Sequence, residues 1–465
     1  MNIHNILNRK ITFKLDALLK RQGIYIVGGA VRDRLLGRDA YDIDIAVQGN
    51  PLKLAERIAN RMHCRIIPLG PRSHPLFRLV TPSYTIDISA LQGNNLETDL
   101  LQRDFTINAL AYETGTHHLI DVTRGVNDIS KRQIRLVSQT GFQADPLRLL
   151  RAYRLASQLD FQIEDNTLRA LHQEAALIRK PAVERIQAEL RAILSRSQIL
   201  DWLQRMADSK ILFYILPELK DLVGCRQGRQ HALDVFDHTL QTVHALQELT
   251  TGISNTKPEF TPLLEPMNTP RRIRLHLAAL LHDIGKPITR QKSTNDQIRF
   301  YGHDTAGAQI AAAIGKRLRM PRKEVESIVQ LVRHHLRPYH LFEAFKHNQL
   351  GSKGMTRFFM QTKGSTADLL ILALADMRAK AIKHRKALQD FEDFIAQLAK
   401  RYTADFKSRS DAPPLLNGFD LIYTLQLTPS PLFNKILQQV RQAQLSGQIT
   451  TPKEAMALAA EMVSQ

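Results

Sequence analysis

Ile24–Gly37 reads IYIVGGAVRDRLLG, and together with Tyr41–Val47, YDIDIAV, it decides the fold of the first part of this 465-residue chain. The apolar, β-branched run that ends at Gly28 and Gly29 is followed by helical spacing, so it predicts a strand, a tight turn and a helix. Adjacent glycines let the backbone approach a phosphate, and the first turn of a helix offers unpaired N–H groups. Glycine also occurs at such turns for conformational reasons alone, so this turn by itself leaves a structural and a functional interpretation open.

Asp42 and Asp44 are two residues apart on the next predicted strand, with isoleucines after each of them. The period of two places both carboxylates on one face, where like charges repel unless a cation lies between them. The alternative is a solvated face of an edge strand, but the apolar neighbours indicate that the other face is buried. Asp87, in the apolar run TIDIS, is placed to complete the site. Three carboxylates that hold two Mg²⁺ ions fit phosphoryl or nucleotidyl transfer.

The periodicity divides the chain into a first part with strands and a longer helical part. Six short β-rich runs lie between residue 23 and about residue 121, namely IYIVGG, YDIDIAV, CRIIPL, LFRLV, YTIDIS and HLIDVT. From about Pro146 onward, apolar positions recur at helical spacing. A polar stretch at 250–270 predicts a surface loop, and a break at 408–414 separates a helical tail. The fold class predicted is therefore α+β, with a small mixed sheet followed by an all-helical remainder.

The chain carries 64 Lys and Arg residues against 45 Asp and Glu residues, a formal net charge of +19. Such an excess calls for a polyanionic partner, and nucleic acid is favoured. An anionic membrane is the alternative, but it requires a basic amphipathic helix or a lipidation signal, and neither is evident. Because 43% of the residues are hydrophobic and 23% are charged, the composition is that of a globular protein and excludes a disordered basic tail.

Cysteine usage and the N-terminus indicate the compartment. The two cysteines, Cys64 and Cys225, are too few for a secreted disulfide scaffold and too far apart for a zinc knuckle. No run of about eighteen apolar residues and no signal peptide is evident. We therefore expect a soluble cytoplasmic protein with no membrane partner.

Three further segments, taken with the glycine turn and the carboxylate pair, resemble a known family. GG followed by VRD and DxD precedes QRDFTINALAY (Gln102–Tyr112) and ADPLRLLRAYRLA (Ala144–Ala156). In this order and spacing the segments resemble the bacterial class II tRNA nucleotidyltransferase and poly(A) polymerase family, within the DNA polymerase β superfamily. The resemblance covers roughly the first 220 residues.

The resemblance implies a role for each matching residue. Asp42, Asp44 and Asp87 are the expected catalytic carboxylates, the first two as Mg²⁺ ligands. The residues expected to bind the nucleotide are Gly28, Gly29, Arg32, Asp33, Arg103, Asp104, Asn108, Asp145, Arg148, Arg151 and Arg154. By resemblance the glycine turn holds the triphosphate and sugar, the RDFTINA motif shapes the pocket and favours ribose, and Asp145 with Arg148 pairs with the base of CTP or ATP. Carboxylate acceptors beside a guanidinium are suited to that task, although a surface ion pair is the structural alternative.

Three positions depart from the family pattern. Gln102 replaces the first arginine of RRDFTINA, and Ala144 replaces the glutamate of EDxxR. The stretch at 89–103, SALQGNNLETDLLQR, is much shorter than the flexible loop that complete CCA-adding enzymes often carry there. In the family that loop is linked to the switch from CTP to ATP, so full CCA addition, CC addition and A addition all stay open.

Histidines and aspartates form a second series in the helical half. His282 and Asp283 lie in the apolar segment AALLHDIG, where two buried ligands would be costly without a partner such as a divalent metal. The series resembles an HD phosphohydrolase domain, in which His238, His282, Asp283 and Asp376 are the ligand candidates, with His303 and His334 nearby and Lys286 as a phosphate contact. A lone helical histidine is more often structural, and whether this site is catalytic and which metal it holds stay open.

Together the two resemblances predict four domains: a nucleotidyltransferase head at 1–125, a helical neck that reads the base at 126–228, an HD domain at 229–400 and a helical tail at 401–465. Two basic runs, KRLRMPRK (Lys316–Lys323) and RAKAIKHRKA (Arg378–Ala387), are expected to contact the RNA backbone or to form solvated helix faces.

The function predicted is template-independent addition of C, A or both to the 3′ end of tRNA, from CTP and ATP with Mg²⁺, the acceptor arm being the RNA partner. A bacterial poly(A) polymerase is the nearest alternative, because it shares the head motifs. An HD phosphohydrolase with an RNA- or nucleotide-binding head is the second, and a non-enzymatic RNA-binding protein is the third. The last leaves the carboxylate pair and the histidine series unexplained. The sequence makes no prediction of the oligomeric state.

Overall fold

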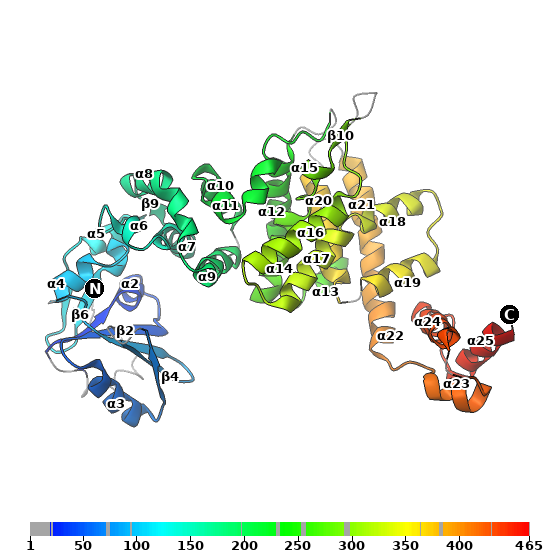
Figure 1. Ribbon diagram of the computed structural model, residues 1–465, viewed down its shortest axis with the longest axis horizontal. Coiled ribbons are helices and arrows are strands. Elements are labelled where there is room, and N and C mark those ends of the chain that lie inside the picture. The colour runs from blue at the N-terminus through cyan, green and yellow to red at the C-terminus, as the bar shows by residue number, and fades with distance from the viewer. Residues whose placement is uncertain are drawn as a thin grey trace. The chain divides into compact units, whose positions relative to one another are not determined.

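The computed structural model describes residue 19 and residues 22–464, apart from 71–74, 94, 197, 229–232, 253–256, 293–297, 363, 381–384 and 429. The chain forms two compact units (Figure 1). The first contains the described residues up to Ile193 together with Arg205–Ile215, and the second contains Leu194–Gln204 and Leu216 onward. The four predicted domain boundaries stay a prediction beside this division.

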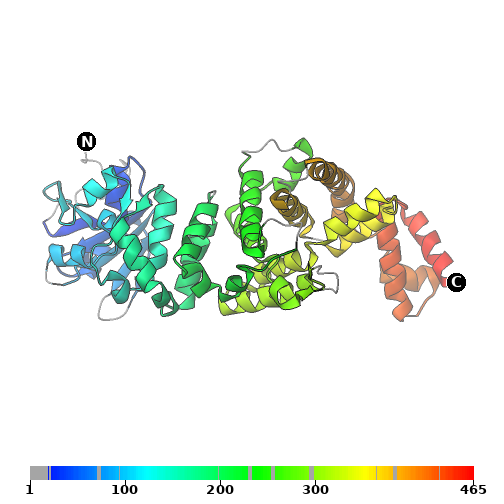
Figure 2. The ribbon, with the colours of Figure 1, turned by 90° about the horizontal axis from the view of Figure 1, so that it is seen from above.

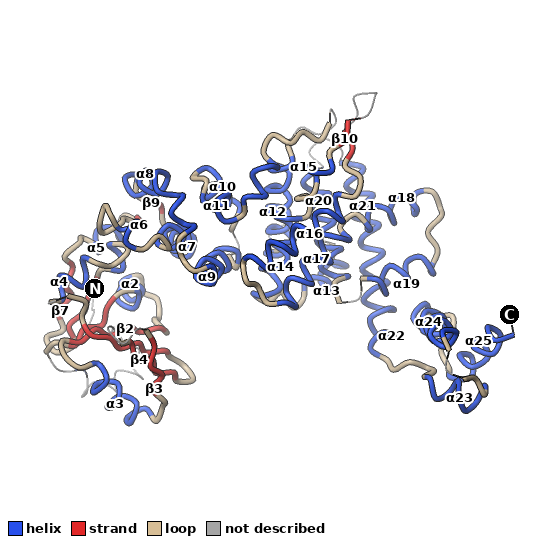
Figure 3. The backbone as a smooth tube through the Cα atoms, viewed as in Figure 1, coloured by secondary structure: helices blue, strands red, loops and turns tan. Residues whose placement is uncertain are grey.

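A seven-stranded mixed sheet forms the centre of the first unit. Its strands are β1 (Ile24–Val27), β2 (Asp42–Val47), β3 (Ile66–Leu69), β4 (Leu76–Val80), β5 (Thr85–Ala90), β6 (Leu110–Glu113) and β7 (His118–Asp121). They lie in the order β3-β4-β5-β2-β1-β6-β7. Every pair is antiparallel except β2 and β5, which run parallel with Asp44 beside Asp87. The α+β fold class is confirmed, since strands gather in this sheet and helices dominate the rest (Figure 3).

The six predicted strands all form. A seventh strand, β6, was not predicted, because its residues had been treated as part of the segment that contains the RDFTINA motif. β6 pairs with β1 on the side away from β2, so the chain passes directly from the motif into a strand of the sheet. The helices of this part are α2 (Gly29–Leu35), α3 (Pro51–Met62), α4 (Leu96–Leu101), the 3-10 turn η2 (Thr106–Asn108) and α5 (Gly125–Ser130).

Short helices complete the first unit and lead into the second. They are α6 (Gly141–Ala144), α7 (Arg148–Leu159), α8 (Asp165–Glu174), η3 (Ala175–Arg179), α9 (Val183–Leu194), α10 (Leu200–Asp208) and α11 (Ile211–Ile215), with a small sheet of β8 (Gln133–Ile134) and β9 (Gln162–Ile163). α7 buries an apolar stripe that includes Leu149, Tyr153 and Leu159. The Tyr153 hydroxyl donates to Ser209 Oγ at 3.0 Å, which satisfies the polar end of a fully buried ring.

The second unit is helical (Figure 2). Its elements are η4 (Pro217–Leu222), α12 (Val235–Thr251), η5 (Pro258–Phe260), α13 (Thr261–Leu264), α14 (Thr269–Leu281), α15 (Lys286–Thr289), β10 (Gln291–Lys292), β11 (Ile298–Arg299), α16 (His303–Arg317), α17 (Arg322–His334), α18 (Arg337–Lys346), α19 (Ser352–Gln361), α20 (Thr366–Lys380) and α21 (Arg385–Lys400). The predicted loop at 250–270 contains two short helical segments, η5 and α13. Pro258 is the first residue of η5 and Pro262 the second residue of α13, positions at which proline favours the start of a helix.

The C-terminal helices have a small core of their own. They are the π-helical turn η7 (Arg401–Phe406), α22 (Lys407–Asp411), α23 (Gly418–Leu425), α24 (Pro431–Ser446) and α25 (Pro452–Ser464). The predicted break begins later than expected, after Asp411, because the helix continues through Ser408. No helix among the described residues is long and apolar enough to cross a membrane.

Candidate active site

The glycine turn connects β1 to α2 in a conformation that only glycine adopts easily. Gly28 has φ 72° and ψ −133°, and its N–H donates to the carbonyl of Leu110 at 3.0 Å. A Cβ on Gly28 would lie 3.0 Å from Arg103 Nη1 and 3.5 Å from Asp44 Oδ2. The missing side chain therefore keeps open the space between an arginine and a carboxylate, where a phosphate group would fit.

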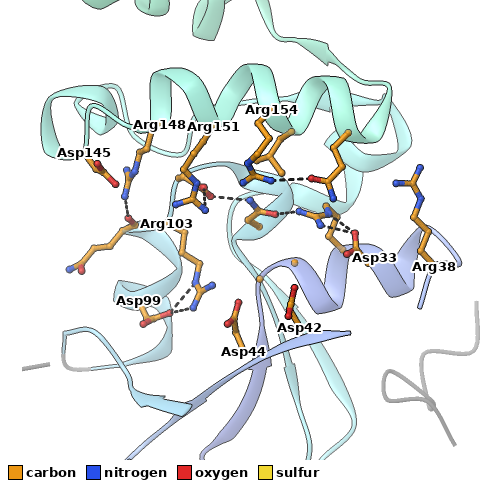
Figure 4. A pocket seen from close by; sticks show the side chains of 18 of the residues that line it. Asp33, Arg38, Asp42, Asp44, Asp99, Arg103, Asp145, Arg148, Arg151 and Arg154 are labelled. Carbon is orange, nitrogen blue, oxygen red and sulfur yellow. Dashed lines mark hydrogen bonds and ion pairs between the residues drawn. The ribbon is translucent and has the colours of Figure 1, made fainter. Parts of the chain in front are cut away.

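Asp42 and Asp44 extend from one face of β2, and Ile43 and Ile45 between and after them are buried on the other face. Both carboxylates are open to the cavity, next to the glycine turn (Figure 4). Burial nevertheless raises the pKa of Asp44; Arg103 opposes this rise, and Asp87 and Asp42 add to it by repulsion. A divalent cation would relieve that repulsion, and carboxylate oxygens are the ligands that Mg²⁺ prefers.

Asp87 lies beside Asp44 on the neighbouring strand, but it is already paired. Arg78 on β4 donates from Nε and Nη2 to the two oxygens of Asp87 at 2.8 and 2.7 Å. This bidentate bond also raises the pKa of Arg78, so the guanidinium stays charged. A hollow of about 370 Å³ lies over these residues and both carboxylates of β2. Asp87 therefore lies in the sheet between Asp44, a metal-ligand candidate, and Arg78, its partner on β4.

Asp99, which the sequence analysis did not single out, fixes Arg103. Its Oδ2 accepts from Arg103 Nε and Nη2 at 3.1 and 3.0 Å, and its Oδ1 accepts from the backbone N–H of Gln92 at 2.9 Å. Asp99 is buried on α4, whose N-cap is Asn95. Arg103 follows the C-cap of α4, and its spacing of four from Asp99 is the signal that predicts such an ion pair.

The RDFTINA motif forms a buried polar chain across the back of the cavity. Arg32 Nη1 donates to Asn108 Oδ1 at 2.6 Å, and Asn108 Nδ2 donates to Asp104 Oδ1 at 3.1 Å. Arg151 Nη2 lies 2.8 Å from Asp104 Oδ2, and Arg32 also binds Asp33. The chain joins α2 to α7, so the glycine turn and the arginine helix are held at a fixed separation.

Arg148, Arg151 and Arg154 line the cavity from successive turns of α7 (Figure 4). Arg148 donates to the carbonyl of Gln102 at 2.6 Å, and burial lowers its pKa. Asp145, just before α7, lies 3.2 Å from Arg185. Asp145 and Arg148 both line the cavity but have different partners: Asp145 accepts from Arg185 and from the N–H of Leu147, and Arg148 donates from Nη2.

These residues surround one polar cavity of about 670 Å³. It contains every predicted nucleotide-binding residue and both carboxylates of β2, and Asp87 lies outside its lining. The lining residues that the sequence analysis did not assign are Arg38, Asp39, Tyr41, Gln92, Asp99, Gln102, Leu155 and Gln158. Within the stretch 89–103, β5 ends at Ala90 and α4 spans Leu96–Leu101.

The histidine series of the second unit gathers into one buried cluster. His238 on α12 has its Nε2 2.9 Å from Asp376 Oδ1 on α20, and His282 Nε2 lies 3.2 Å from Asp283 Oδ2. Residues of the cluster form two groups of three, and within each group the ligand atoms lie within 4.8 Å of one another. One group is His238, His282 and Asp283, and the other is Asp283, His303 and His335. Asp283 belongs to both groups, because its Oδ2 faces His238 and His282 while its Oδ1 faces His303 and His335.

His335, and not the predicted His334, completes this cluster. His335 is buried with its Nε2 3.3 Å from His303 Nε2, whereas His334 is half-buried beside Arg333 and Arg337, which with burial lower its pKa. Adjacent residues on a helix point about 100° apart, so only one of the two can face the core.

The imidazoles of the cluster are oriented by backbone carbonyls. Nδ1 of His282, His303 and His335 lies 2.8, 2.7 and 2.6 Å from the carbonyl oxygens of Ala279, Phe300 and Val332, respectively. A carbonyl only accepts, so each Nδ1 donates and each Nε2 is left to bind a metal when the ring is neutral. Burial lowers the pKa of His335 to about 3, which keeps that ring neutral at pH 7.

Two lysines neutralise the carboxylates of the cluster. Lys286 Nζ donates to Asp283 Oδ2 and to Gln227 Oε1, both at 2.6 Å. Lys380 Nζ donates to Asp376 Oδ2 at 2.8 Å, beside the Tyr339 hydroxyl. Lys286 therefore contacts a metal-ligand candidate directly.

The basic runs are partly paired. Arg317 binds Glu218 at 2.8 Å and Arg322 binds Glu326 at 2.7 Å, so part of the first run forms ion pairs within the second unit. Lys383 of the second run lies outside the described residues. The assignment of both runs to RNA contacts stays a prediction.

In the first unit, a carboxylate pair, a glycine turn and a row of arginines share one cavity. Carboxylates hold divalent cations, while the turn and the arginines match the charge and shape of a triphosphate. This combination defines a metal-dependent nucleotidyltransferase site.

Comparisons with known proteins agree with this class. Residues 24–135 match the Poly A polymerase head domain, 160–222 the probable RNA and SrmB-binding site of polymerase A, and 235–404 the HD domain. The A-adding tRNA nucleotidyltransferase of Deinococcus radiodurans is 33% identical over 94% of each chain. The CC-adding tRNA nucleotidyltransferase of Thermus thermophilus is 34% identical over 93% of this chain and 92% of its own. The chain therefore belongs to the tRNA nucleotidyltransferase family.

A solved structure shows the same fold. The Thermotoga maritima CCA-adding enzyme complexed with tRNA matches with a TM-score of 0.65 at 20% identity, over 99% of this chain and 96% of that chain. The predicted family, fold class and enzyme class are thus confirmed.

Proposed function

We propose that this chain completes the 3′ end of tRNA by transferring C, A or both from CTP and ATP. The observation that carries the proposal is the cavity of about 670 Å³ in the first unit, which joins the carboxylates of β2 to the arginines of α7. Relatives that match almost the whole chain are A-adding and CC-adding tRNA nucleotidyltransferases, and solved structures of the same fold include CCA-adding enzyme with CTP and with ATP. A poly(A) polymerase is disfavoured because these full-length relatives act on tRNA.

Asp42 and Asp44 are the residues that would hold Mg²⁺, which when bound activates the attacking hydroxyl and stabilises the leaving pyrophosphate. The family uses a divalent metal, and Mg²⁺ is our choice because the donors are carboxylate oxygens. Gly28 lets the triphosphate approach the backbone, and Arg103, held by Asp99, supplies positive charge beside it. The residues of this cavity thus bind and orient the nucleotide.

Asp145 and Arg148 are the residues that we assign to the base. One offers carboxylate acceptors and the other guanidinium donors, which is the complement of a cytosine or adenine edge. The carbonyl of Gln102 holds Arg148 at 2.6 Å, so the donor reaches the base at a fixed angle. Full CCA, CC and A addition differ in which base this pair accepts at each step.

Three tRNA substrates test the proposal: one that ends before the first C, one that ends after C and one that ends after CC. Each is incubated with labelled CTP and ATP and Mg²⁺, and the 3′ ends are sequenced. We expect incorporation on at least one substrate, and the pattern tells CCA, CC and A addition apart. No incorporation on any of them would overturn the proposal, and long A tails on unrelated RNA would favour a poly(A) polymerase.

Asp42→Asn tests the metal assignment. It should abolish incorporation without unfolding the protein, because Asp42 is exposed and isosteric asparagine keeps the strand. Asp160→Asn is the matched control: Asp160 is a highly exposed aspartate of the same unit, and it pairs with exposed Arg132. Full incorporation by Asp42→Asn would refute the assignment.

We also propose that the HD domain is a metal-dependent phosphohydrolase. Three imidazoles of the cluster donate from Nδ1 to backbone carbonyls, so their Nε2 atoms are acceptors when the rings are neutral. Two of these Nε2 atoms lie 3.3 Å apart, an arrangement that a bound cation would stabilise. Asp376→Asn should abolish phosphate release from nucleotides with added Mn²⁺, Ni²⁺ or Co²⁺ and leave nucleotide incorporation unchanged. Phosphate release that survives Asp376→Asn but not Asp42→Asn would place the activity in the head.

A cytoplasmic location, where tRNA substrates are found, is part of the same proposal.

A further inference from the structure

Half of the sheet face that carries Asp42 and Asp44 is open. Over β1 and β6 this face is covered, since Val27 and Ala111 pack with Leu100 of α4. Over β5, β4 and β3, and as far as the described residues go, the same face carries exposed or half-exposed side chains, because strand register places Thr85, Asp87, Arg78, Val80, Ile67 and Leu69 on it. We name these six residues the open face. It continues directly from the metal-ligand candidates, and the hollow of about 370 Å³ lies where the two meet.

Arg78 is the cation of the open face. Its side chain is 42% exposed, and its two bonds to Asp87 use Nε and Nη2 and leave Nη1. An arginine that is fixed by a carboxylate and keeps a donor toward solvent is preorganised for a phosphate oxygen. The apolar side chains beside it, among them Val80 at 50% exposure, suit a ribose or a base rather than a second phosphate.

An aromatic pair stands at the edge of the same strands. Tyr41 and Tyr84 precede β2 and β5, and because these strands run parallel, the two rings meet and stack with centroids 6.1 Å apart. Tyr41 is 61% exposed and lines the nucleotide cavity. Exposed aromatic rings beside a cationic group are how proteins hold single-stranded nucleic acid without reading its sequence.

The chemistry of transfer assigns the two sides of Asp42 and Asp44. The acceptor 3′ oxygen forms a bond to the α-phosphorus while the bond to the departing pyrophosphate breaks, and the hydroxyl proton passes to water. Attack on the α-phosphorus is in line, so the acceptor oxygen must lie opposite the departing pyrophosphate. Arg103 and the glycine turn occupy one side, and the open face lies on the other side of the carboxylates.

We propose that the open face seats the 3′-terminal nucleotides of the acceptor RNA, with Arg78 contacting a terminal phosphate and Tyr41 stacked on Tyr84 supporting a terminal base. The proposal rests on the proposed nucleotidyl transfer. Arg78 does not line the nucleotide cavity, so acceptor and nucleotide affinity are separable at this residue, whereas Tyr41 lines that cavity as well.

Binding of a tRNA acceptor-stem minihelix with a single-stranded 3′ end, measured without nucleotide and in EDTA, tests Arg78. Arg78→Gln should weaken binding roughly tenfold and lower the slope of log affinity against log salt by about 0.7, the value for one phosphate contact on a single strand. Arg61→Gln is the control, because Arg61 is an exposed arginine on α3 of the same unit. Equal slopes for Arg78→Gln and wild type would overturn the assignment.

The double variant Arg78→Gln/Asp87→Asn separates contact from repulsion. Removing Arg78 alone unmasks Asp87, whose charge would itself repel RNA. If Arg78 binds the phosphate, the double variant stays weak, whereas recovery of wild-type affinity would show that Arg78 only neutralises Asp87 and does not contact the RNA. In turnover, Arg78→Gln should raise KM for the minihelix and leave KM for CTP within about twofold. If wild type incorporates nothing, the proposed function fails instead, and the binding result still decides the role of Arg78.

Photocrosslinking tests the aromatic pair without depending on turnover. A minihelix with 5-iodocytidine as its last nucleotide should crosslink to the peptide that contains Tyr41 or Tyr84. Tyr41→Leu should reduce the crosslink and weaken binding roughly tenfold, and Tyr41→Phe, which keeps the ring, should restore both. Crosslinks confined to other peptides would overturn this part of the proposal.

Discussion

Gly28→Ala is expected to separate the cost of backbone strain from the loss of phosphate binding. At φ 72° and ψ −133° an L-residue is strained by about 1–3 kcal/mol, which for a unit of this size lowers Tm by roughly 2–10 °C. The new methyl group would also lie 3.0 Å from Arg103 Nη1 and 3.5 Å from Asp44 Oδ2, in the space assigned to a phosphate. Loss of one such electrostatic contact commonly costs about 100-fold in turnover.

Gly37→Ala is the matched control for this experiment. Gly37 has φ 73° at the end of α2, and a Cβ there meets nothing within 4 Å. Both variants should lose a few degrees of Tm, measured by calorimetry, but only Gly28→Ala should lose kcat/KM for CTP. If the two variants have the same kcat/KM, the close approach of backbone and phosphate is refuted and the glycine is conformational only.

Three other predictions concern single polar side chains. Burial raises the pKa of Asp44, so the folded chain loses stability as the pH rises through that pKa. Asp44→Asn should therefore raise Tm in EDTA at pH 7 while abolishing nucleotide incorporation. A lower Tm for this variant would contradict the prediction. Asp99→Asn weakens the grip on Arg103 and should raise KM for CTP by roughly 10-fold in steady-state assays, so an unchanged KM would show that Arg103 needs no anchor. Burial lowers the pKa of His276 to about 4, so stability should fall as the pH drops from about 6.5 to 4; His276→Gln, measured by urea unfolding, should flatten this dependence.

Local periodicity predicted most of the sheet and the positions of the carboxylates. Period two was enough to place Asp42 and Asp44 on one face, because Ile43 and Ile45 need the other. Local periodicity did not predict the strand order or the register. The pairing of Arg78 with Asp87 depends on β4 and β5 being antiparallel neighbours, which no local pattern specifies.

The histidine cluster shows where helical phase was needed. Ile328, Leu331 and Val332 form the buried stripe of α17, and His335 continues it three and four residues later. That stripe predicts His335 over His334, although the motif alone does not distinguish them. Asp99 had a comparable signal, an aspartate four residues before Arg103, but an isolated helical ion pair is too common to stand out.

The alignment of the three arginines on α7 restricts which insertions and substitutions this helix can accept. Each residue added to a helix rotates all later side chains of that helix by about 100°, so a single insertion between Arg148 and Arg154 would carry one end of the row out of the cavity. Replacing outward-facing side chains of α7 leaves that alignment untouched. We therefore expect natural variants to differ freely in the identity of those residues and hardly at all in their number, with length changes displaced to connections such as the one between β5 and α4.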